Sequence, residues 1–260
     1  MNKPPRVLTV AGSSAGGSAG VQADLKTFQE LDVYGLSVIT AFVARHPKTN
    51  QNIHIQPIET IEAQFLATMN QVGIDAIKIG MLFSSDIIKT VAKLLKQSNV
   101  KKIVVDPVMI GKLKSKLLQD EAIEQLKESI LPQATVITPN MEEASLLLDG
   151  RKIQTLDDIK EAAIDIHKQG YQVVLVKGGR LEGPATDVLF NGDKLITYKA
   201  PRIDTNNTSG AGCTYSAAIT ANLAKGMPIY EAVHSAKSFI TTAIEYGFSY
   251  SNSNVAGPTD

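Results

Sequence analysis

The spacing of apolar residues along the chain is the feature that most restricts its fold. Short runs rich in β-branched residues, such as 7–11 and 102–105, alternate with segments in which apolar residues return every three or four positions, such as 21–31. The first pattern is typical of strands and the second of helices. Strands that alternate with helices build βαβ units, and runs that are apolar throughout indicate a parallel sheet with helices on both faces. We therefore predict an α/β fold.

The same patterns place the individual elements. We predict strands at 7–11, 36–44, 75–82, 102–105, 134–138, 172–176, 187–190 and 195–198. We predict helices at 21–31, 61–72, 85–97, 122–129, 142–148, 156–169, 215–225 and 229–246. Asn191-Gly192 is a strong signal for a two-residue hairpin between the last two strands. Because no linker or repeat interrupts the rhythm, we predict one domain over residues 1–260.

The charge balance and the single cysteine exclude several classes of protein. The chain has 26 basic and 26 acidic residues, whereas a nucleic-acid binder usually has a basic excess. No apolar run approaches the roughly 18 residues that span a bilayer, and residues 1–6 lack the apolar core of a signal peptide. One cysteine cannot form an internal disulfide, which suits a reducing compartment. We expect a cytoplasmic protein with no nucleic-acid or membrane partner.

Polar or glycine-rich residues follow several of the predicted strands. These positions are 12–14, 80–81, 106–107, 140 and 177–179. In open parallel sheets, ligands bind at the carboxyl ends of the strands. We therefore expect these residues to converge on one rim of the sheet.

The only cysteine, Cys213, lies in the sequence TSGAGCT at 208–214, where a helix is predicted to begin. Glycines before a helix leave backbone N–H groups free to point at one spot, and the helix dipole favours an anion there. A thiol at that place would have a lowered pKa. One interpretation is an anion hole for a phosphoryl group with Cys213 beside it as a base. The alternative is a small buried cysteine in an ordinary turn.

A second glycine-rich stretch, GSSAGGSAG at 12–20, follows a strand and precedes a helix. It is not G-x-G-x-x-G, and the chain contains no G-x-x-x-x-G-K-[ST], so neither a nicotinamide dehydrogenase nor a P-loop kinase is supported. The stretch is either a loop that lets a substrate approach the backbone or a flexible turn.

Asn140 and Glu143 also allow two interpretations. They lie in TPNMEEA, directly after a predicted strand. Asn140 could cap the following helix, with Glu143 at its third position as in a capping box. The alternative is that the Glu143 carboxylate holds a magnesium ion, directly or through water.

Several motifs occur in an order that resembles the ribokinase superfamily. They are AGSSAGGSAGVQADLKTFQEL at 11–31, KIGML at 78–82, VVDPVM at 104–109, ITPNMEEA at 137–144, VKGG at 176–179 and SGAGCT at 209–214. Within that superfamily they look like the branch of hydroxymethylpyrimidine/phosphomethylpyrimidine kinases and related bacterial pyridoxal kinases. The resemblance implies a three-layer α/β/α sandwich with a mostly parallel central sheet. It also implies Mg²⁺-dependent transfer of the ATP γ-phosphoryl group to a hydroxymethyl group on a small heteroaromatic ring, and a homodimer.

The resemblance also assigns roles to particular residues. Cys213 matches the catalytic base, beside an anion hole formed by Gly210, Ala211 and Gly212. The ATP and magnesium side is expected to consist of Asp106, Asn140, Glu143, Lys177, Gly178, Gly179 and Thr205, with Glu143 and Asp106 as magnesium residues, through water if not directly. The substrate side is expected to consist of Gly12, Ser14, Ala19, Asp24, Arg45, Met81 and Val108.

Four positions depart from the usual motifs of the branch. Ser14 replaces an acid, Ser209 replaces a histidine, and Gly111 replaces the second cysteine of some pyridoxal kinases. Arg45 stands where thiamin-branch kinases have a glutamine that hydrogen-bonds an aminopyrimidine. An arginine has only donors, and an unpaired donor on the pyrimidine costs roughly 1–3 kcal/mol.

These departures rank the candidate functions. We expect a kinase of pyridoxal and pyridoxine, because of Arg45. The alternative is a hydroxymethylpyrimidine/phosphomethylpyrimidine kinase of thiamin biosynthesis. A non-catalytic ligand-binding homologue is a third candidate, favoured by Ser14 and Ser209.

Overall fold

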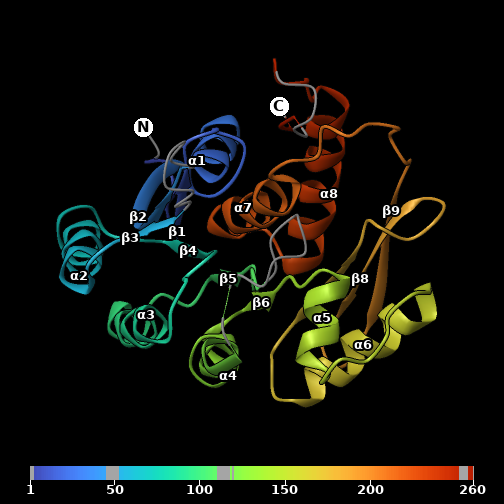
Figure 1. Ribbon diagram of the computed structural model, residues 1–260, viewed down its shortest axis with the longest axis horizontal. Helices are drawn as coiled ribbons and strands as arrows, with labels where there is room; N and C mark the ends of the chain where they lie inside the picture. Colours follow the sequence, from blue (N-terminus) through green and yellow to red (C-terminus); the bar gives the residue numbers. More distant parts are fainter. Residues whose placement is uncertain (1–2, 45–52, 110–117, 119, 252–256, 260) are drawn as a thin grey trace.

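The chain forms one nine-stranded sheet with helices on both faces (Figure 1). The computed structural model describes residues 3–44, 53–109, 118, 120–251 and 257–259. The strands are β1 (Arg6–Ser14), β2 (Tyr34–Val43), β3 (Ile53–Ile55), β4 (Ala76–Ile79), β5 (Ile103–Val105), β6 (Val136–Ile137), β7 (Val174–Gly178), β8 (Ala185–Phe190) and β9 (Leu195–Ala200).

The helices fall between these strands in the predicted alternation. They are α1 (Val21–Glu30), α2 (Ile58–Ala67), α3 (Ser85–Ser98), α4 (Asp120–Ser129), α5 (Met141–Leu147), α6 (Leu156–Lys168), α7 (Ala211–Ala224) and α8 (Ile229–Glu245). A π-helical turn, η1 (Thr68–Val72), extends α2, and a 3₁₀ turn, η2 (Leu131–Gln133), precedes β6.

The sheet has the order β3-β2-β1-β4-β5-β6-β7-β8-β9. The strands from β2 to β7 run parallel, whereas β3 at one edge and β8 and β9 at the other pair antiparallel with their neighbours. A hairpin joins β8 to β9 as predicted, and Gly192 has a φ of 94°, but its loop spans residues 191–194 and not two residues, because Phe190 pairs with Leu195. The observed sheet confirms the predicted α/β fold.

Helices α1, α7 and α8 cover one face of the sheet, and α2, α3, α4 and α6 cover the other (Figure 1). Alternate residues of the central strands enter the two layers. In β5, for example, Val104 packs into the layer of α7 and α8, while Ile103 and Val105 pack into the opposite layer. Burial of both strand faces explains why the strands read as continuous apolar runs.

Several boundaries differ from the sequence predictions. Helix α7 begins at Ala211, four residues before the predicted start at 215, so Cys213 lies in its first turn. Strand β1 continues to Ser14 instead of ending at residue 11, because Ser13 and Ser14 still pair with β2 after an irregularity. Strand β3 was not predicted, since three residues are too few to show an alternation. The helix predicted at 61–72 begins at Ile58, directly after Pro57, and its last turn is η1. Among the described helices, none is both long enough and apolar enough to cross a membrane.

Candidate active site

A cavity of about 500 Å³ lies where β5, β6 and β7 end, next to the first turn of α7. Asp106 follows β5, Asn140 follows β6 and Lys177 lies near the end of β7, and all three line this cavity. Cys213, in the first turn of α7, lines it as well. For these three strands, the structure confirms that their polar carboxyl ends converge on one rim.

Most of the predicted site residues contribute to the lining. Those present are Ala19, Asp106, Val108, Asn140, Glu143, Lys177, Gly179, Thr205, Gly210, Ala211, Gly212 and Cys213. Gly12, Ser14, Asp24, Met81 and Gly178 are described by the structure but do not line the cavity. Arg45 and Gly111 lie outside the described residues.

Two glycines permit close backbone contacts beside the cavity: Gly210 lets the turn before α7 approach the 12–20 loop, and Gly20 lets that loop fold back on itself. Gly210 has a φ of 85°, and a Cβ atom there would lie 1.7 Å from the carbonyl oxygen of Ser18. Gly20 has a φ of 63°, and a Cβ atom there would lie 2.1 Å from the carbonyl oxygen of Gly12. Only glycine tolerates both the positive φ and the close backbone contact. The last residues of the chain also hold this turn, because the Ser209 N–H donates to the Gly257 carbonyl at 3.0 Å.

The first turn of α7 presents free donors to the cavity. The first N–H groups of a helix have no intrahelical acceptor, and those of Gly212 and Cys213 have no acceptor among the described residues. The helix has 14 residues, so its dipole adds positive potential at this end. A Cβ atom on Gly212 would lie 3.4 Å from the Lys177 ammonium. The turn can therefore bind an anion between backbone N–H groups and a lysine.

Lys177 is held in place by an ion pair with Asp106. Its Nζ donates to Asp106 Oδ1 at 2.6 Å, and Thr138 donates to the same oxygen at 3.3 Å. Burial alone would lower the pKa of Lys177, but the attraction of Asp106 and Glu143 outweighs it and raises that pKa. Lys177 is therefore a fixed cation in the wall.

Asn140 and Glu143 form the predicted capping box of α5. Asn140 Oδ1 accepts from the Glu142 and Glu143 N–H groups at 2.9 and 3.0 Å, and Glu143 Oε2 accepts from the Asn140 N–H at 2.8 Å. Burial raises the pKa of Glu143 to about 8, although Lys177 lowers it. Both residues also line the cavity, so the cap does not exclude a role toward a ligand.

These carboxylates fit a magnesium ion held largely by water and phosphate. Among the described residues, no group of three or more His, Cys, Asp or Glu side chains is arranged to hold a metal ion. Mg²⁺ is usually bound by one or two carboxylates together with substrate phosphates and water. Glu143 and Asp106 supply two carboxylates beside the anion-binding turn, which suits that kind of site. A cation there would favour the ionised form of Glu143.

The structure corrects the expected acidity of Cys213. Burial raises the pKa of its thiol, the nearby Lys78 lowers it, and Asp24 and Asp106 raise it. The Gly20 N–H lies 3.5 Å from the sulfur and also favours the thiolate. The net direction is upward, so the helix terminus does not by itself produce the lowered pKa that the sequence predicts.

Asp24 is not in the wall of the cavity, which corrects its assignment to the substrate side. Its side chain has no exposure and accepts from Lys78 Nζ at 2.7 and 2.8 Å. Thr9 Oγ1 donates to it at 2.6 Å. Both carboxylate oxygens of Asp24 therefore accept hydrogen bonds from inside the protein.

The other predicted residues outside the lining have structural contacts. The Ser14 N–H donates to Gln22, Thr40 donates to the Met81 carbonyl, and the Gly178 N–H donates to Asp187 Oδ1. A Cβ atom on Gly12 would lie 3.0 Å from the Phe83 ring.

The cavity also contains residues that the sequence analysis missed. Asp187 of β8 and Lys237 of α8 line it and form a buried ion pair, with Nζ 2.6 Å from Oδ2. Lys237 Nζ lies 5.8 Å from the centre of the Tyr215 ring. The sequence feature that could have revealed this pair is Lys237, which lies at helical spacing from Val233 and Ile240 on the buried side of α8.

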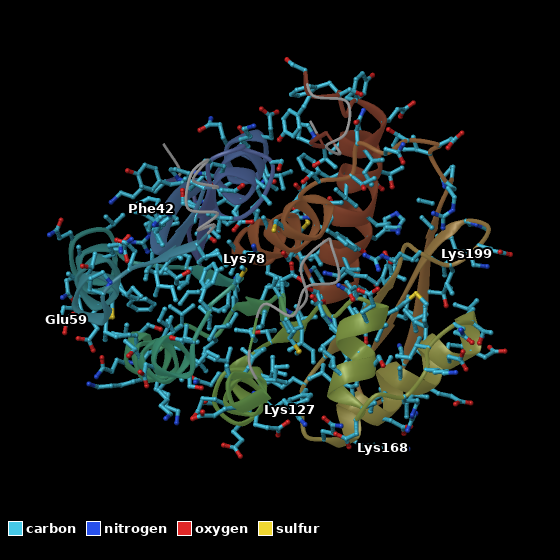
Figure 2. All side chains as sticks on the ribbon, viewed as in Figure 1. Phe42, Glu59, Lys78, Lys127, Lys168 and Lys199 are labelled. Carbon is cyan, nitrogen blue, oxygen red and sulfur yellow. The ribbon has the colours of Figure 1, made fainter. Side chains whose placement is uncertain are left out.

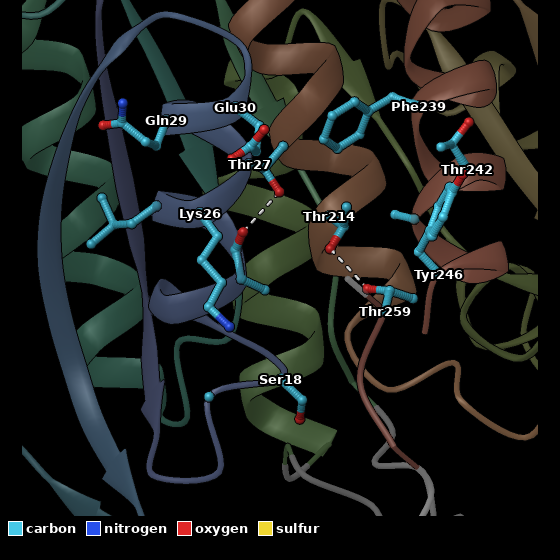
Figure 3. Close-up of a pocket in the computed structure, with 14 residues that line it drawn as sticks. Ser18, Lys26, Thr27, Gln29, Glu30, Thr214, Phe239, Thr242, Tyr246 and Thr259 are labelled. Carbon is cyan, nitrogen blue, oxygen red and sulfur yellow. Dashed lines mark hydrogen bonds between the residues drawn. The ribbon is translucent and has the colours of Figure 1, made fainter. Parts of the chain in front are cut away.

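A larger cavity of about 730 Å³ lies between α1, α7 and α8 (Figure 3). Lys26 and Glu30 of α1 face Phe239 and Tyr246 of α8 across it, with Thr214 of α7 between them (Figure 3). Cys213, Asn140, Glu143 and Lys177 are not in its lining. The smaller cavity is therefore the candidate active site.

Comparisons with known proteins identify the family. The phosphomethylpyrimidine kinase family matches residues 14–260. The pyridoxine kinase of Bacillus subtilis (strain 168) is 46% identical over 258 residues, which cover 98% of this chain and 94% of that protein. The hydroxymethylpyrimidine/phosphomethylpyrimidine kinase of the same organism is 43% identical over 242 residues, covering 92% and 89%.

Solved structures show the same relationship. The crystal structure of an ADP complex of Bacillus subtilis pyridoxal kinase matches with a TM-score of 0.92 and 43% identity, covering 99% of this chain and 97% of that one. Pyridoxal kinase from Staphylococcus aureus in complex with AMP-PCP and pyridoxal matches with a TM-score of 0.91 and 38% identity, covering 100% and 94%. With a ribokinase-like fold, a family match over nearly its whole length and these relatives, the chain belongs to the phosphomethylpyrimidine kinase family and is a kinase.

Proposed function

We propose that this kinase transfers the γ-phosphoryl group of ATP to the hydroxymethyl group of pyridoxal or pyridoxine. One observation carries the proposal: a thiol, free helix N–H groups, a fixed lysine and two carboxylates line the same cavity. Phosphoryl transfer depends mainly on alignment and on stabilising negative charge, and this set of groups is suited to both tasks.

Each part of the wall has a proposed task. The N–H groups of Gly212 and Cys213, together with Lys177, bind the oxygens of the transferring phosphoryl group. Glu143 and Asp106 hold water molecules or a phosphate-bound Mg²⁺, which neutralises charge on the phosphates when it is bound. Cys213 accepts the hydroxymethyl proton. Because burial raises its pKa, the thiol is mostly protonated at neutral pH and its ionised fraction grows with pH.

The choice of a vitamin B6 substrate rests on two supports. The pyridoxine kinase of Bacillus subtilis is 46% identical, and the Staphylococcus aureus neighbour binds pyridoxal. In the sequence, Arg45 replaces the glutamine that would accept a hydrogen bond from an aminopyrimidine.

A hydroxymethylpyrimidine kinase is the second candidate. A relative with that name is 43% identical, nearly as similar as the pyridoxine kinase. The two activities need the same phosphoryl-transfer side and differ only in how the ring is recognised.

The family resemblance suggests a homodimer, and the single cysteine suits a reducing compartment such as the cytoplasm. Light scattering on the purified protein tests the oligomeric state. A mass near twice the 27.9 kDa of one chain would support the dimer, and a mass near 27.9 kDa would contradict it.

The proposed function is tested by measuring ADP release from Mg-ATP with pyridoxal, pyridoxine and hydroxymethylpyrimidine in separate assays at equal concentration. We expect the highest kcat/KM with a vitamin B6 form. A higher value with the pyrimidine would favour the second candidate. No acceptor-dependent release with any of the three would contradict both.

A further inference from the structure

A charged pair lies inside the protein, behind the wall that carries Cys213. Lys78 is in the middle of β4, and neither its side chain nor that of Asp24 has any exposure. In Figure 2, Lys78 lies in the interior near α7, whereas Glu59, Lys127, Lys168 and Lys199 lie toward the periphery. A buried lysine and aspartate cost desolvation energy, and an apolar pair of similar size is often at least as stable. Stability alone therefore does not account for the pair.

The fold places this ion pair and the Cys213 thiol on the same face of the sheet. Thr9 of β1 and Lys78 of β4 are register neighbours, and Thr9 donates to the same carboxylate as Lys78 does. The carboxylate belongs to α1, whose preceding residue Gly20 has its N–H 3.5 Å from Cys213 Sγ. Helix α7, which carries Cys213, packs on β4 and on α1. One face of the sheet thus brings the pair and the thiol together.

Four charged groups act on the thiol, from two sides. Lys78 of β4 and Asp24 of α1 lie behind it, and Asp106 after β5 and Lys177 of β7 lie on the cavity side. Burial raises the pKa of the thiol most strongly; Lys78 is the main group that lowers it, and Asp24 opposes Lys78. Burial alone would lower the pKa of Lys78, but the attraction of Asp24 outweighs it, so Lys78 remains a cation.

We infer that Lys78 and Asp24 are positioning residues for Cys213: Lys78 is the cation behind the sulfur, and Asp24 is the partner that keeps it charged. The Lys78 ammonium stabilises the thiolate from inside the protein. Removing either partner therefore removes this cation and disfavours the thiolate, whereas a purely structural pair would leave the ionisation of the thiol unchanged. The inference deepens the proposed function, since it concerns the group that accepts the substrate proton.

The test uses the fact that Cys213 is the only cysteine. The rate of alkylation by iodoacetamide is followed by intact mass as a function of pH, and its midpoint reports the ionisation of this thiol alone. For Lys78→Met we expect the midpoint to rise by about one pH unit, which slows alkylation about tenfold at a pH below both midpoints. For Asp24→Asn we also expect the midpoint to rise, because burial lowers the pKa of Lys78 once its carboxylate partner is absent, and the cation is lost.

The second buried ion pair of the cavity supplies a matched control. Lys237→Met and Asp187→Asn break a lysine–aspartate contact of 2.6 Å, but neither residue is among the groups that shift the Cys213 thiol. These variants should leave the midpoint unchanged. Unchanged or lowered midpoints in Lys78→Met and Asp24→Asn would overturn the inference.

Folding of each variant is checked by circular dichroism and thermal melting. Where a single variant does not fold, the neutral pair Asp24→Asn/Lys78→Met replaces it. We expect its midpoint to rise, since Lys78 acts on the thiol more strongly than Asp24, and an unchanged midpoint would overturn the inference. Alkylation needs no turnover, so a failure of the proposed kinase activity and a failure of this inference are distinguishable.

Discussion

The two sides of the candidate active site differ in how completely the described structure assembles them. On the side that we expect to bind ATP (the ATP side), Asp106, Asn140, Glu143 and Lys177 line one cavity together with the first turn of α7. On the expected substrate side, Ala19 and Val108 line that cavity, whereas Asp24 does not and forms a buried ion pair with Lys78.

The difference reflects what fixes each side. Strand ends and a helix terminus position the ATP side, and the backbone geometry of the fold determines both. Ring recognition is expected to depend on individual side chains, including Ser14 and Arg45, which depart from the usual motifs. We infer that the chemistry follows from the fold, whereas the preferred ring follows from a few side chains.

The largest effect is expected on kcat, from substitution of Cys213. The Cys213→Ala variant should lose about 10²–10⁴-fold in kcat, the range for removing a general base, and keep its nucleotide affinity. Steady-state ADP release and a nucleotide titration measure the two quantities. If turnover survives, Cys213 is a packing residue in an ordinary turn.

The next largest effect is expected from disturbing the close contact between the 12–20 loop and the turn before α7. In Gly210→Ala, the new methyl group would lie 1.7 Å from the Ser18 carbonyl oxygen, on a residue with a φ of 85°. A strained backbone costs about 1–3 kcal/mol before the clash is relieved, so we expect a melting temperature at least about 4 °C lower, and lower activity. Gly16→Ala is the control, because its new methyl group meets only the Tyr250 hydroxyl, at 3.7 Å. Equal melting temperatures for the two variants would contradict the close approach.

The ionisation of Glu143 is expected to make Mg²⁺ binding depend on pH. Its carboxyl has a pKa of about 8 in the folded protein, above the ordinary value of 4.5, so it is largely protonated at neutral pH without a cation. Mg²⁺ should therefore bind more tightly as pH rises toward about 8. We expect Glu143→Gln to weaken the apparent Mg²⁺ affinity about 10- to 100-fold and to remove this pH dependence.

The raised pKa of Glu143 also has a consequence for stability. Folding favours the protonated form of Glu143, so the contribution of this carboxyl to the free energy of unfolding falls as pH rises from about 4.5 to about 8. The melting temperature of Glu143→Gln, measured relative to wild type, should therefore increase across this range. A constant difference would contradict the burial of the carboxyl.

The smallest effect concerns the substrate side. Exchange of Arg45→Gln should raise the pyrimidine-to-pyridoxal ratio of kcat/KM about tenfold, because glutamine supplies the acceptor that arginine lacks. The variant should leave the KM for ATP unchanged. An unchanged ratio would show that Arg45 does not select the ring.

The sequence predicted well the sheet and the convergence of strand-end residues on one cavity, for physical reasons. Strands buried on both faces read as apolar runs, and Asn140 and Glu143 have the spacing of a capping box, which the structure contains. The sequence could not show that Asp24 meets Lys78, because that contact joins residues 54 positions apart. Nor could it give the direction in which the pKa of Cys213 shifts, which depends on burial and on the charges of Lys78, Asp24 and Asp106.

The central claim is that this pocket phosphorylates a vitamin B6 ring in preference to a pyrimidine. Its most direct test is one reaction in which pyridoxal, pyridoxine and hydroxymethylpyrimidine compete at equal concentration for limiting Mg-ATP, with the phosphorylated products quantified by mass spectrometry. We predict that pyridoxal or pyridoxine phosphate dominates. Dominance of the pyrimidine phosphate, or the absence of all three products, would contradict the claim.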